Sequence, residues 1–317
     1  MVAPSGPVEA ARLDAGCGTL RRLGLDVELA KHVLDRVNLD GSAPADGSRR
    51  GLAGGDADRA ADLADAWCDP GVRAVVCARG GYGATRVLDL LDWDALAAAT
   101  EADVADGRGP KILHGSSDVT ALHAAFGTRL GVTTSFGPMA AGALADPDPA
   151  ASGDAAADRA WTIDALRGAL FGDAAPLPGA RALRHGRAEG VLTGGTLSLL
   201  TALLGTPYAP PPATGRVAFL EDVTEAPYRI DRMLVQLLQA GWFDGVAGIA
   251  LGSWERCGAP DELDAVFTAR LGGLGVPVLA GVPAGHGARQ GTLELGARAV
   301  LDADARTLTT PAAGGAR

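Results

Sequence analysis

Cysteine is scarce in this chain of 317 residues, which contains only four. They are scattered, at Cys17, Cys68, Cys77 and Cys257, and none belongs to the CxxC pair of a zinc site or to the spacing of a disulfide framework. Aromatic residues are also few, at 4%, but apolar residues in total reach 47%, which is ample for a packed core. We therefore expect a globular fold that needs neither disulfides nor a structural metal.

An excess of positive charge is also absent, because the chain contains 28 Lys and Arg residues but 38 Asp and Glu residues, which gives a net charge of −10. Such an acidic chain repels phosphate backbones, so we expect no nucleic-acid partner. No apolar run approaches the roughly 20 residues that span a bilayer, so we expect no membrane contact. Residues 1–7 lack the basic and apolar regions of a signal peptide, which favours a cytoplasmic location.

The first half of the chain alternates between helical and strand-like patterns. Helices are predicted at 10–23 and 56–68, and strands at 26–30, 72–78 and 111–114. Strands separated by helices indicate an α/β fold with a parallel sheet. Active sites in such sheets lie beyond the carboxyl ends of the strands, so the loops after residues 78 and 114 are the first places to search.

The second half predicts a separate unit. A stretch at 146–158, rich in Pro, Ala, Ser and Asp, reads as linker. We therefore predict an N-terminal α/β domain over 1–145, a linker over 146–184 and a smaller mixed α/β C-terminal domain over 185–317. In the second domain, strands are predicted at 217–220, 246–251 and 277–282, and an amphipathic helix at 230–240.

A candidate nucleophile lies between the strand at 111–114 and a following helix, in the run Gly115-Ser116-Ser117-Asp118. A serine at a sharp strand-to-helix turn is exposed beside unpaired helix N–H groups, which favour developing negative charge. The alternative is that one of these residues merely caps the helix. The G-x-S-x-G motif, which is typical of a nucleophilic serine at a strand-to-helix turn, is also incomplete, because Val119 occupies the position of its second glycine.

A glycine-rich loop, residues 79–83, follows the strand at 72–78. Glycine lets a backbone amide approach a ligand closely, as in an oxyanion hole or a phosphate cradle. The dinucleotide-binding fingerprint fails because Arg86 occupies the place of its third glycine, and the chain contains no Walker A motif. A plain turn remains an equal alternative at this point.

A candidate acid and base occur in the second half. Glu221 and Asp222 close the strand at 217–220, where alternation places their side chains on opposite faces. His286 lies between two glycines after the last predicted strand, and His114 is its rival because it is close in sequence to Ser117. Together with the glycine-rich loop, these residues supply a nucleophile, a base, an acid and an amide donor, as serine-based acyl transfer requires.

Six segments carry a more specific signal, because in sequence and order they resemble the LD-carboxypeptidase family. They are ARGGYG (78–83), GSSDVTALH (115–123), FGPM (136–139), GGTLSLLTALLGTPY (194–208), FLEDVTEAPYRIDRML (219–234) and PAGHGARQGTLELG (283–296). The resemblance implies a two-domain serine peptidase with a nucleotide-binding-like first domain. It further implies removal of the terminal D-amino acid from murein tetrapeptides in peptidoglycan recycling, a homodimer, and no metal or other cofactor.

The same resemblance assigns the site residues motif by motif. It implies Ser117 as nucleophile, Glu221 as acid and His286 as base, with the backbone amides of Gly81 and Asp118 as the oxyanion hole. The chain departs from the family in carrying Ser116 where an aromatic residue is usual. It also begins almost at the segment that usually follows a first strand, so we expect that strand to be encoded upstream.

Two alternative functions remain open on the sequence. A related group hydrolyses the acyl amide of microcin C-type antibiotics in self-immunity, although the run PYRIDR at 227–232 looks more like the peptidoglycan-recycling branch. From a different class, the chain could be a non-catalytic protein that binds a small molecule through residues 79–83.

Overall fold

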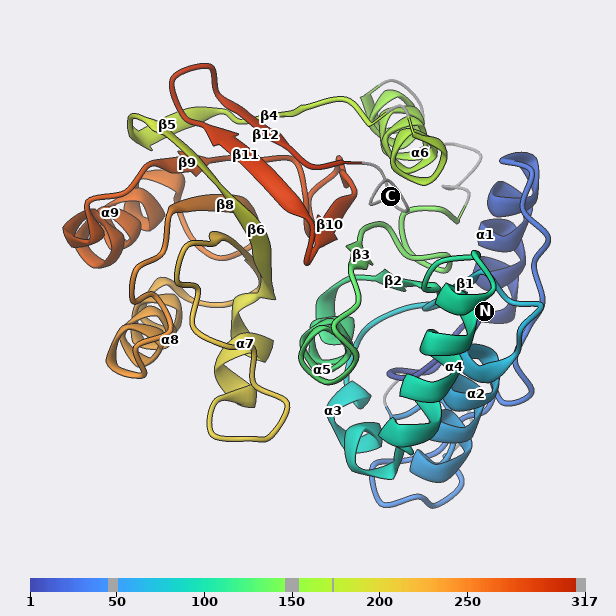
Figure 1. The fold of residues 1–317 in the computed structure, drawn as a ribbon. Coiled ribbons are helices and arrows are strands. Elements are labelled where there is room, and N and C mark those ends of the chain that lie inside the picture. Colours follow the sequence, from blue (N-terminus) through green and yellow to red (C-terminus); the bar gives the residue numbers. More distant parts are fainter. Residues whose placement is uncertain (45–50, 146–153, 173, 312–317) are drawn as a thin grey trace.

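The computed structural model describes residues 1–44, 51–145, 154–172 and 174–311 and has two α/β domains, each built on its own sheet (Figure 1). The N-terminal sheet has four strands and the C-terminal sheet has eight. Among the described residues, no helix is both long and apolar enough to cross a membrane.

The N-terminal sheet is mostly parallel and has the order β1-β2-β3-β10. Its strands are β1 (Ala74–Val76), β2 (Ile112–Gly115), β3 (Thr134–Phe136) and β10 (Leu293–Leu295). The first three are parallel, whereas β10 pairs with β3 in the antiparallel sense. Val2 forms a parallel bridge with Cys77, just beyond β1. Because β10 comes from the far end of the chain, both halves of the sequence build this sheet.

Helices cover the N-terminal sheet and enclose its core. They are α1 (Ala10–Arg22), α2 (Asp56–Cys68), α3 (Ala84–Val87), α4 (Trp93–Ala105) and α5 (Thr120–Leu130), with short 3₁₀ turns at η1 (Leu88–Leu90) and η2 (Ser117–Val119). Trp67 of α2 and Phe126 of α5 pack edge to face with ring centroids 4.8 Å apart. Gly131 ends α5 in a left-handed conformation, which glycine adopts without steric penalty.

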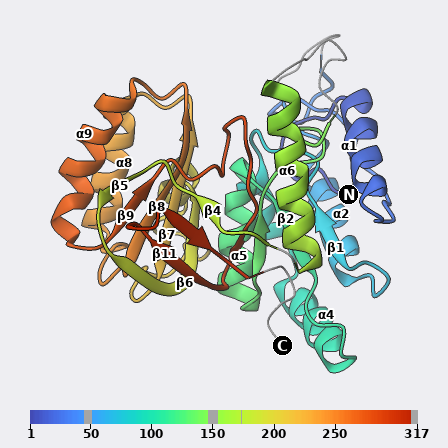
Figure 2. The ribbon, with the colours of Figure 1, turned by 90° about the horizontal axis from the view of Figure 1, so that it is seen from above.

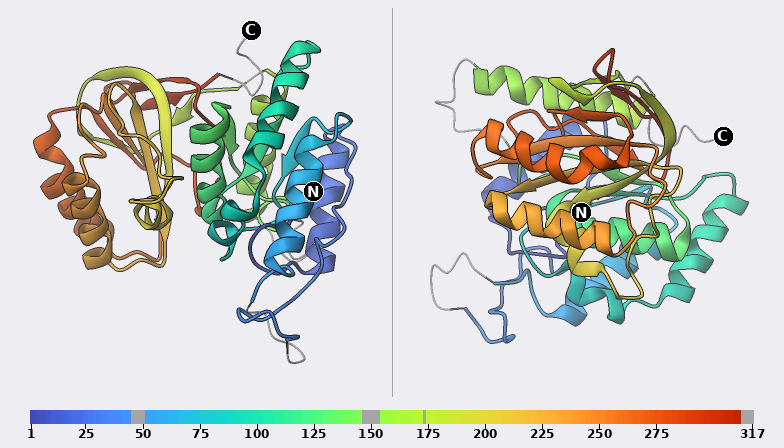
Figure 3. Two further views of the ribbon diagram at one scale, coloured as in Figure 1. Left: turned by 60° about the horizontal axis from the view of Figure 1, so that its bottom comes forward. Right: turned by 90° about the vertical axis from the view of Figure 1, so that its left-hand side faces the viewer.

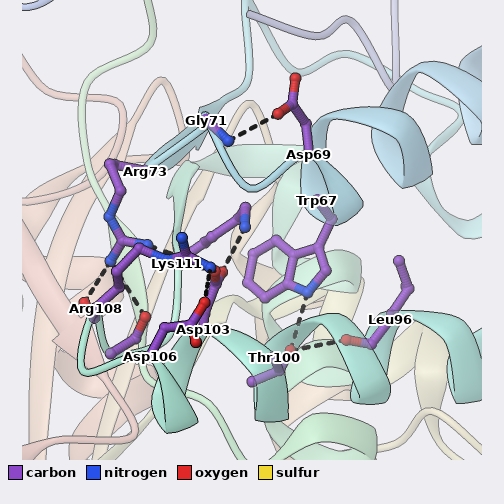
Figure 4. Close-up of polar contacts among 11 residues, drawn as sticks. Trp67, Asp69, Gly71, Arg73, Leu96, Thr100, Asp103, Asp106, Arg108 and Lys111 are labelled. Atoms are coloured by element: carbon purple, nitrogen blue, oxygen red, sulfur yellow. Dashed lines mark hydrogen bonds and ion pairs between the residues drawn. The ribbon is translucent and has the colours of Figure 1, made fainter.

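A buried ion-pair network fixes the entry to β2 (Figure 4). The Lys111 ammonium bonds the carboxylate of Asp103 at the end of α4, and both side chains are at most 3% exposed. The guanidinium of Arg108 lies 2.8 Å from the other oxygen of that carboxylate. Burial alone would raise the pKa of Asp103, but these cations outweigh it and lower the pKa.

The C-terminal sheet is mixed, with the order β4-β12-β11-β6-β7-β8-β9-β5. Its strands are β4 (Leu177–Pro178), β5 (Arg181–Arg184), β6 (Arg187–Thr196), β7 (Val217–Val223), β8 (Gly248–Glu255), β9 (Val278–Ala280), β11 (Arg298–Asp302) and β12 (Thr307–Thr309). The central run from β6 to β9 is parallel, and the outer pairings are antiparallel. Its remaining helical elements are α7 (Leu197–Leu203), α8 (Pro227–Gln239), α9 (Pro260–Leu271) and η3 (Gly272–Leu274).

The two faces of the C-terminal sheet have different neighbours. Helices α8 and α9 cover the face turned away from the N-terminal domain (Figures 2 and 3), and Leu220 of β7 packs there with Ile230 of α8. Phe219 points to the other face and meets Phe136 of β3, with ring centroids 5.3 Å apart. Because side chains alternate along a strand, Glu221 faces the N-terminal domain as Phe219 does.

Most predicted elements are present, with shifted ends. The helix at 56–68 is confirmed as α2, the helix at 10–23 as α1, and the strands at 72–78 and 111–114 as the shorter β1 and β2. The prediction of a strand at 26–30 is wrong. Its hydrogen bonds run from the Met1 amine to Glu28, from the Ala30 amide to Met1, from the Arg21 side chain to Val27 and from the Val33 amide to Ala30, and it joins no sheet ladder in the described chain.

The predicted linker needs a correction. Residues 146–153 lie outside the described residues, but α6 (Asp154–Phe171) is a regular helix within the range predicted as linker. Its buried Leu166 packs against Leu20 and Leu144 of the N-terminal domain, and this burial stabilises a segment that composition alone marked as irregular. The division of the chain at 145 and 185 stays a prediction.

Candidate active site

The turn between β2 and α5 holds Ser117 in an unusual conformation. Its φ is +61°, in the left-handed region that non-glycine residues rarely adopt. Such backbone strain costs about 1–3 kcal/mol and is concentrated at functional sites. Ser117 is half-buried, whereas Ser116 is only 4% exposed. The turn therefore presents the hydroxyl of Ser117 rather than that of Ser116.

Capping does not account for this turn. Neither η2 nor α5 has a side-chain cap at its N-terminus. The Asp118 carboxylate instead accepts hydrogen bonds from the Ser5 hydroxyl, at 2.6 Å, and from the amide of Ala84, at 2.8 Å. Burial raises the pKa of Asp118, against the opposing effect of these hydrogen bonds. Asp118 thus ties the Ser117 turn to the N-terminal loop and to the glycine-rich loop.

The glycine-rich loop lies directly against the Ser117 turn. A Cβ atom at Gly80 would lie 2.9 Å from Ser117 Cβ and 3.3 Å from the Asp118 amide nitrogen, so no larger residue fits there. Gly81 has a φ of +112°, which L side chains rarely adopt. In the described part of the chain the Gly81 amide has no hydrogen-bond partner. The amides of Gly81 and Asp118 therefore belong to loops that meet at Ser117.

Glu221 and His286 form a hydrogen-bonded pair in the C-terminal domain. Glu221 Oε2 lies 2.7 Å from His286 Nδ1, Glu221 is fully buried, and the His286 side chain is 22% exposed. The Thr196 hydroxyl donates to the other carboxylate oxygen of Glu221. A Cβ atom at Gly285 would lie 2.4 Å from Glu221 Oε2, so glycine is needed beside the pair.

The charge of Glu221 controls the protonation of His286. Burial alone would lower the pKa of His286, but the hydrogen bond and the negative charge of Glu221 outweigh it and raise the pKa. Because Nδ1–H donates to the carboxylate, Nε2 is the nitrogen free to accept a proton. This is the arrangement that a general base requires.

A hydrogen bond between the two domains joins the segment that carries Ser117 to the strand that lies beside Glu221. The amide of Thr196, at the end of β6, donates to the hydroxyl of Thr120, at the start of α5, over 3.1 Å. Thr120 directly follows the turn that carries Ser117, and Thr196 pairs in register with Glu221. No hydrogen bond joins Ser117 to His286 in the described residues, and such contacts are often long in an unliganded site.

The rival acid and base are engaged elsewhere. His114 contacts the Ser135 hydroxyl at 3.1 Å and the Pro138 carbonyl at 2.8 Å, and burial lowers its pKa. Asp222 accepts hydrogen bonds from the amides of Ser198 and Val223, and burial raises its pKa to about 6. Neither residue is hydrogen bonded to the proposed triad within the described chain.

Sequence reasoning missed the residues that support the site. Thr196 holds Glu221, and the Ser253 hydroxyl accepts a hydrogen bond from the Gly287 amide at 2.9 Å and so fixes the His286 loop. Thr196 follows a glycine pair inside one of the six segments that resemble the family, so its place in that segment could have marked it as a candidate site residue. Ser253 lies outside those segments, and only the fold reveals its role.

Within the described residues, no three His, Cys, Asp or Glu side chains are grouped to hold a metal ion.

Comparison with known proteins identifies the class. The chain matches the LD-carboxypeptidase N-terminal domain over residues 1–137 and the LD-carboxypeptidase C-terminal domain over residues 189–301. It is 32% identical to a murein tetrapeptide carboxypeptidase of Pseudomonas aeruginosa, with 95% of this chain and 92% of the relative aligned. A predicted carboxypeptidase of Streptomyces coelicolor is 49% identical over 98% of this chain and 91% of its own length.

Solved structures agree with these matches. The muramoyltetrapeptide carboxypeptidase of Oxalobacter formigenes superposes with a TM-score of 0.77 at 27% identity, covering 97% of this chain and 95% of that one. The microcin C7 self-immunity protein superposes with a TM-score of 0.80 at 22% identity, covering 98% and 95%, and shows the fold alone. The fold and these matches define a serine-type hydrolase that acts on peptide bonds. More particularly, the chain belongs to the LD-carboxypeptidase family.

Proposed function

We propose that this enzyme removes the terminal D-alanine from murein tetrapeptides, with Ser117, Glu221 and His286 as its catalytic triad. The observation that carries the proposal is the Glu221–His286 pair, which lies across the domain seam from the strained Ser117 turn. The name of the Pseudomonas aeruginosa relative supports the choice of substrate.

The first chemical step is acylation. His286 Nε2 accepts the hydroxyl proton as Ser117 Oγ attacks the carbonyl carbon that precedes D-alanine. The amides of Gly81 and Asp118 donate to the oxyanion that forms. The tetrahedral intermediate then collapses, the C–N bond breaks, and the proton on His286 passes to the leaving amine.

The second step releases the shortened peptide. A water molecule gives a proton to His286 and attacks the acyl–Ser117 ester, which breaks with return of the proton to Ser117. In both steps His286 carries a positive charge transiently, and the buried carboxylate of Glu221 stabilises it at 2.7 Å. Because Glu221 is fully buried, this interaction is stronger than it would be at the surface.

The cellular setting belongs to the same proposal. We propose a cytoplasmic location, as the resemblance to murein-recycling carboxypeptidases implies. We propose a homodimer on the family resemblance. The domain boundaries at 145 and 185 likewise remain part of the proposal.

The decisive experiment is incubation with a murein tetrapeptide, followed by mass spectrometry for the loss of one alanine. Wild type and Ser116→Ala are expected to release alanine, whereas Ser117→Ala is expected to lose several powers of ten in kcat. Release by Ser117→Ala, or its loss in Ser116→Ala alone, would place the nucleophile elsewhere.

The alternatives give different results in the same assay series. A microcin-type immunity enzyme would leave the tetrapeptide intact and hydrolyse an aminoacyl nucleotide amide. A non-catalytic binding protein would do neither and would not react with a serine-directed phosphonate.

A further inference from the structure

Two neighbouring strand ends carry non-glycine residues in the left-handed conformation. Thr224 follows β7 with a φ of +60°, and Arg256 follows β8 with a φ of +55°. The Thr224 amide donates to the carbonyl of Glu255 over 2.8 Å, so the two turns are fastened together. Glycine adopts this conformation without penalty, whereas a non-glycine residue there carries backbone strain of the kind that is concentrated at functional sites.

Arg256 is placed at the carboxyl edge of the sheet, beside the proposed base. Strand β8 lies between β7, which carries Glu221, and β9, whose following loop carries His286. Two hydrogen bonds tie that loop to Ser253, from its amide to Ala284 and from Gly287 to its hydroxyl, both at 2.9 Å. The positive charge of Arg256 also acts on His286 and opposes the effect of Glu221 on its pKa.

The Arg256 side chain is exposed, and in the described residues it has no hydrogen bond or ion pair. Nearby arginines of this domain are engaged: Arg229 lies 3.6 Å from Glu225, and Arg270 is bonded to Asp231 at 2.5 Å. An arginine without a protein partner beside a reaction centre is suited to bind an anionic group of the substrate.

We propose that Arg256 binds the terminal carboxylate of the substrate and so restricts cleavage to the last residue. This inference rests on the proposed carboxypeptidase function. The carboxylate of a one-residue leaving group lies about 4 Å from the attacked carbonyl carbon, because successive Cα atoms are about 3.8 Å apart. Its binding group must therefore lie near the base, and Arg256 directly follows β8, the strand between β7 of Glu221 and β9, which precedes the His286 loop.

The test measures binding separately from turnover. In the Ser117→Ala background, calorimetry compares a murein tetrapeptide with a free terminal carboxylate and the same peptide ending in a carboxamide. We expect the acid to bind about 10- to 100-fold more tightly, as is typical of hydrogen bonds to charged groups. Adding Arg256→Gly should abolish this preference, and Arg256→Lys should restore part of it.

Arg306→Gly is the matched control. Arg306 has a φ of +56° and is exposed, so its replacement relieves the same strain. It follows β11, whose last residue pairs with Arg187 at the start of β6, the end of the sheet opposite to Glu221. Both glycine variants should be as stable as wild type or more so, but Arg306→Gly should keep the preference for the acid.

The outcomes separate the two proposals. If Arg256→Gly retains the preference for the acid, or if Ser117→Ala binds neither peptide, the role of Arg256 is refuted. If the preference depends on Arg256 while the wild type releases no alanine, the carboxylate site stands and the proposed function fails. An equal loss of affinity for the acid and for the amide would also count against a carboxylate site.

Discussion

Replacement of Glu294 by glutamine should remove a pH-dependent loss of stability. Glu294 lies on β10, in register with Ser135 of β3, which is itself in register with His114 of β2. The side chain is 2% exposed, and one of its carboxylate oxygens has no hydrogen-bond partner among the described residues. Burial lowers the pKa of His114, so burial disfavours a compensating positive charge in this row.

The size of the effect follows from the shifted pKa. Burial raises the pKa of Glu294 from 4.5 to about 8, against the opposing hydrogen bond with Ser135. Between these two values the unfolded chain loses the proton and the folded protein keeps it, so stability falls as the pH rises. Each pH unit costs about 1.4 kcal/mol, which gives on the order of 3 kcal/mol at pH 7. Glutamine is neutral throughout and should avoid this loss.

The assay is urea unfolding at pH 6, 7 and 8, followed by tryptophan fluorescence and circular dichroism. Coincident transitions would justify a two-state treatment. The variant should gain about 1.4 kcal/mol on the wild type between pH 6 and 7 and less between pH 7 and 8, where the folded wild type also begins to lose the proton. The control is Glu189→Gln, an exposed position on β6 whose pKa is lowered by Arg187, so it titrates below this range. A difference between Glu294→Gln and wild type that stays constant with pH would refute the reasoning.

Two further predictions concern charge at other sites. Asp103→Asn should lower the free energy of unfolding by about 3–5 kcal/mol, because it leaves Lys111 buried without its partner. Asp106→Asn is the control: this side chain is 62% exposed, and its replacement should cost about 0–1 kcal/mol in the same urea unfolding assay. Since the pKa of Asp103 is lowered, the wild-type advantage should disappear as the pH falls through that pKa. Glu221→Gln should lower kcat/KM and, because burial then dominates, move the acid limb of its pH profile to lower pH; a limb that stays in place would contradict the assignment of His286 as base.

The sequence was informative wherever a pattern depends on local periodicity. Helix α2 matches its predicted range, and the alternation in β7 placed Glu221 and Asp222 on opposite faces. The segment at 26–30 shows the limit of such patterns, because a strand also needs a partner. The pattern could not reveal that the backbone of this segment bonds to Met1 and joins no neighbouring strand in the described chain.

Helix α6 shows a different limit. Its buried residues Thr162, Leu166 and Ala169 follow helical spacing, but the surrounding Ala, Asp and Gly residues dilute the signal. The partner face, at Leu20 and Leu144, comes from other parts of the chain. Burial against such distant residues is a tertiary effect that composition does not report.

Long-range pairing decides the geometry of the site, and it is the least predictable feature. Strand β10 joins the N-terminal sheet and follows the His286 loop in sequence, so this loop is anchored to β8 at one end and to β3 at the other. The same strand places Glu294 in the buried row beside His114, just before the Ser117 turn. The pairing of β10 with β3, which links the two domains, therefore also buries the Glu294 carboxyl group at a cost in stability. If Glu294→Gln gains stability but leaves alanine release unchanged, the pairing depends on the backbone of β10; if release falls as stability rises, the carboxyl group itself helps to align the seam.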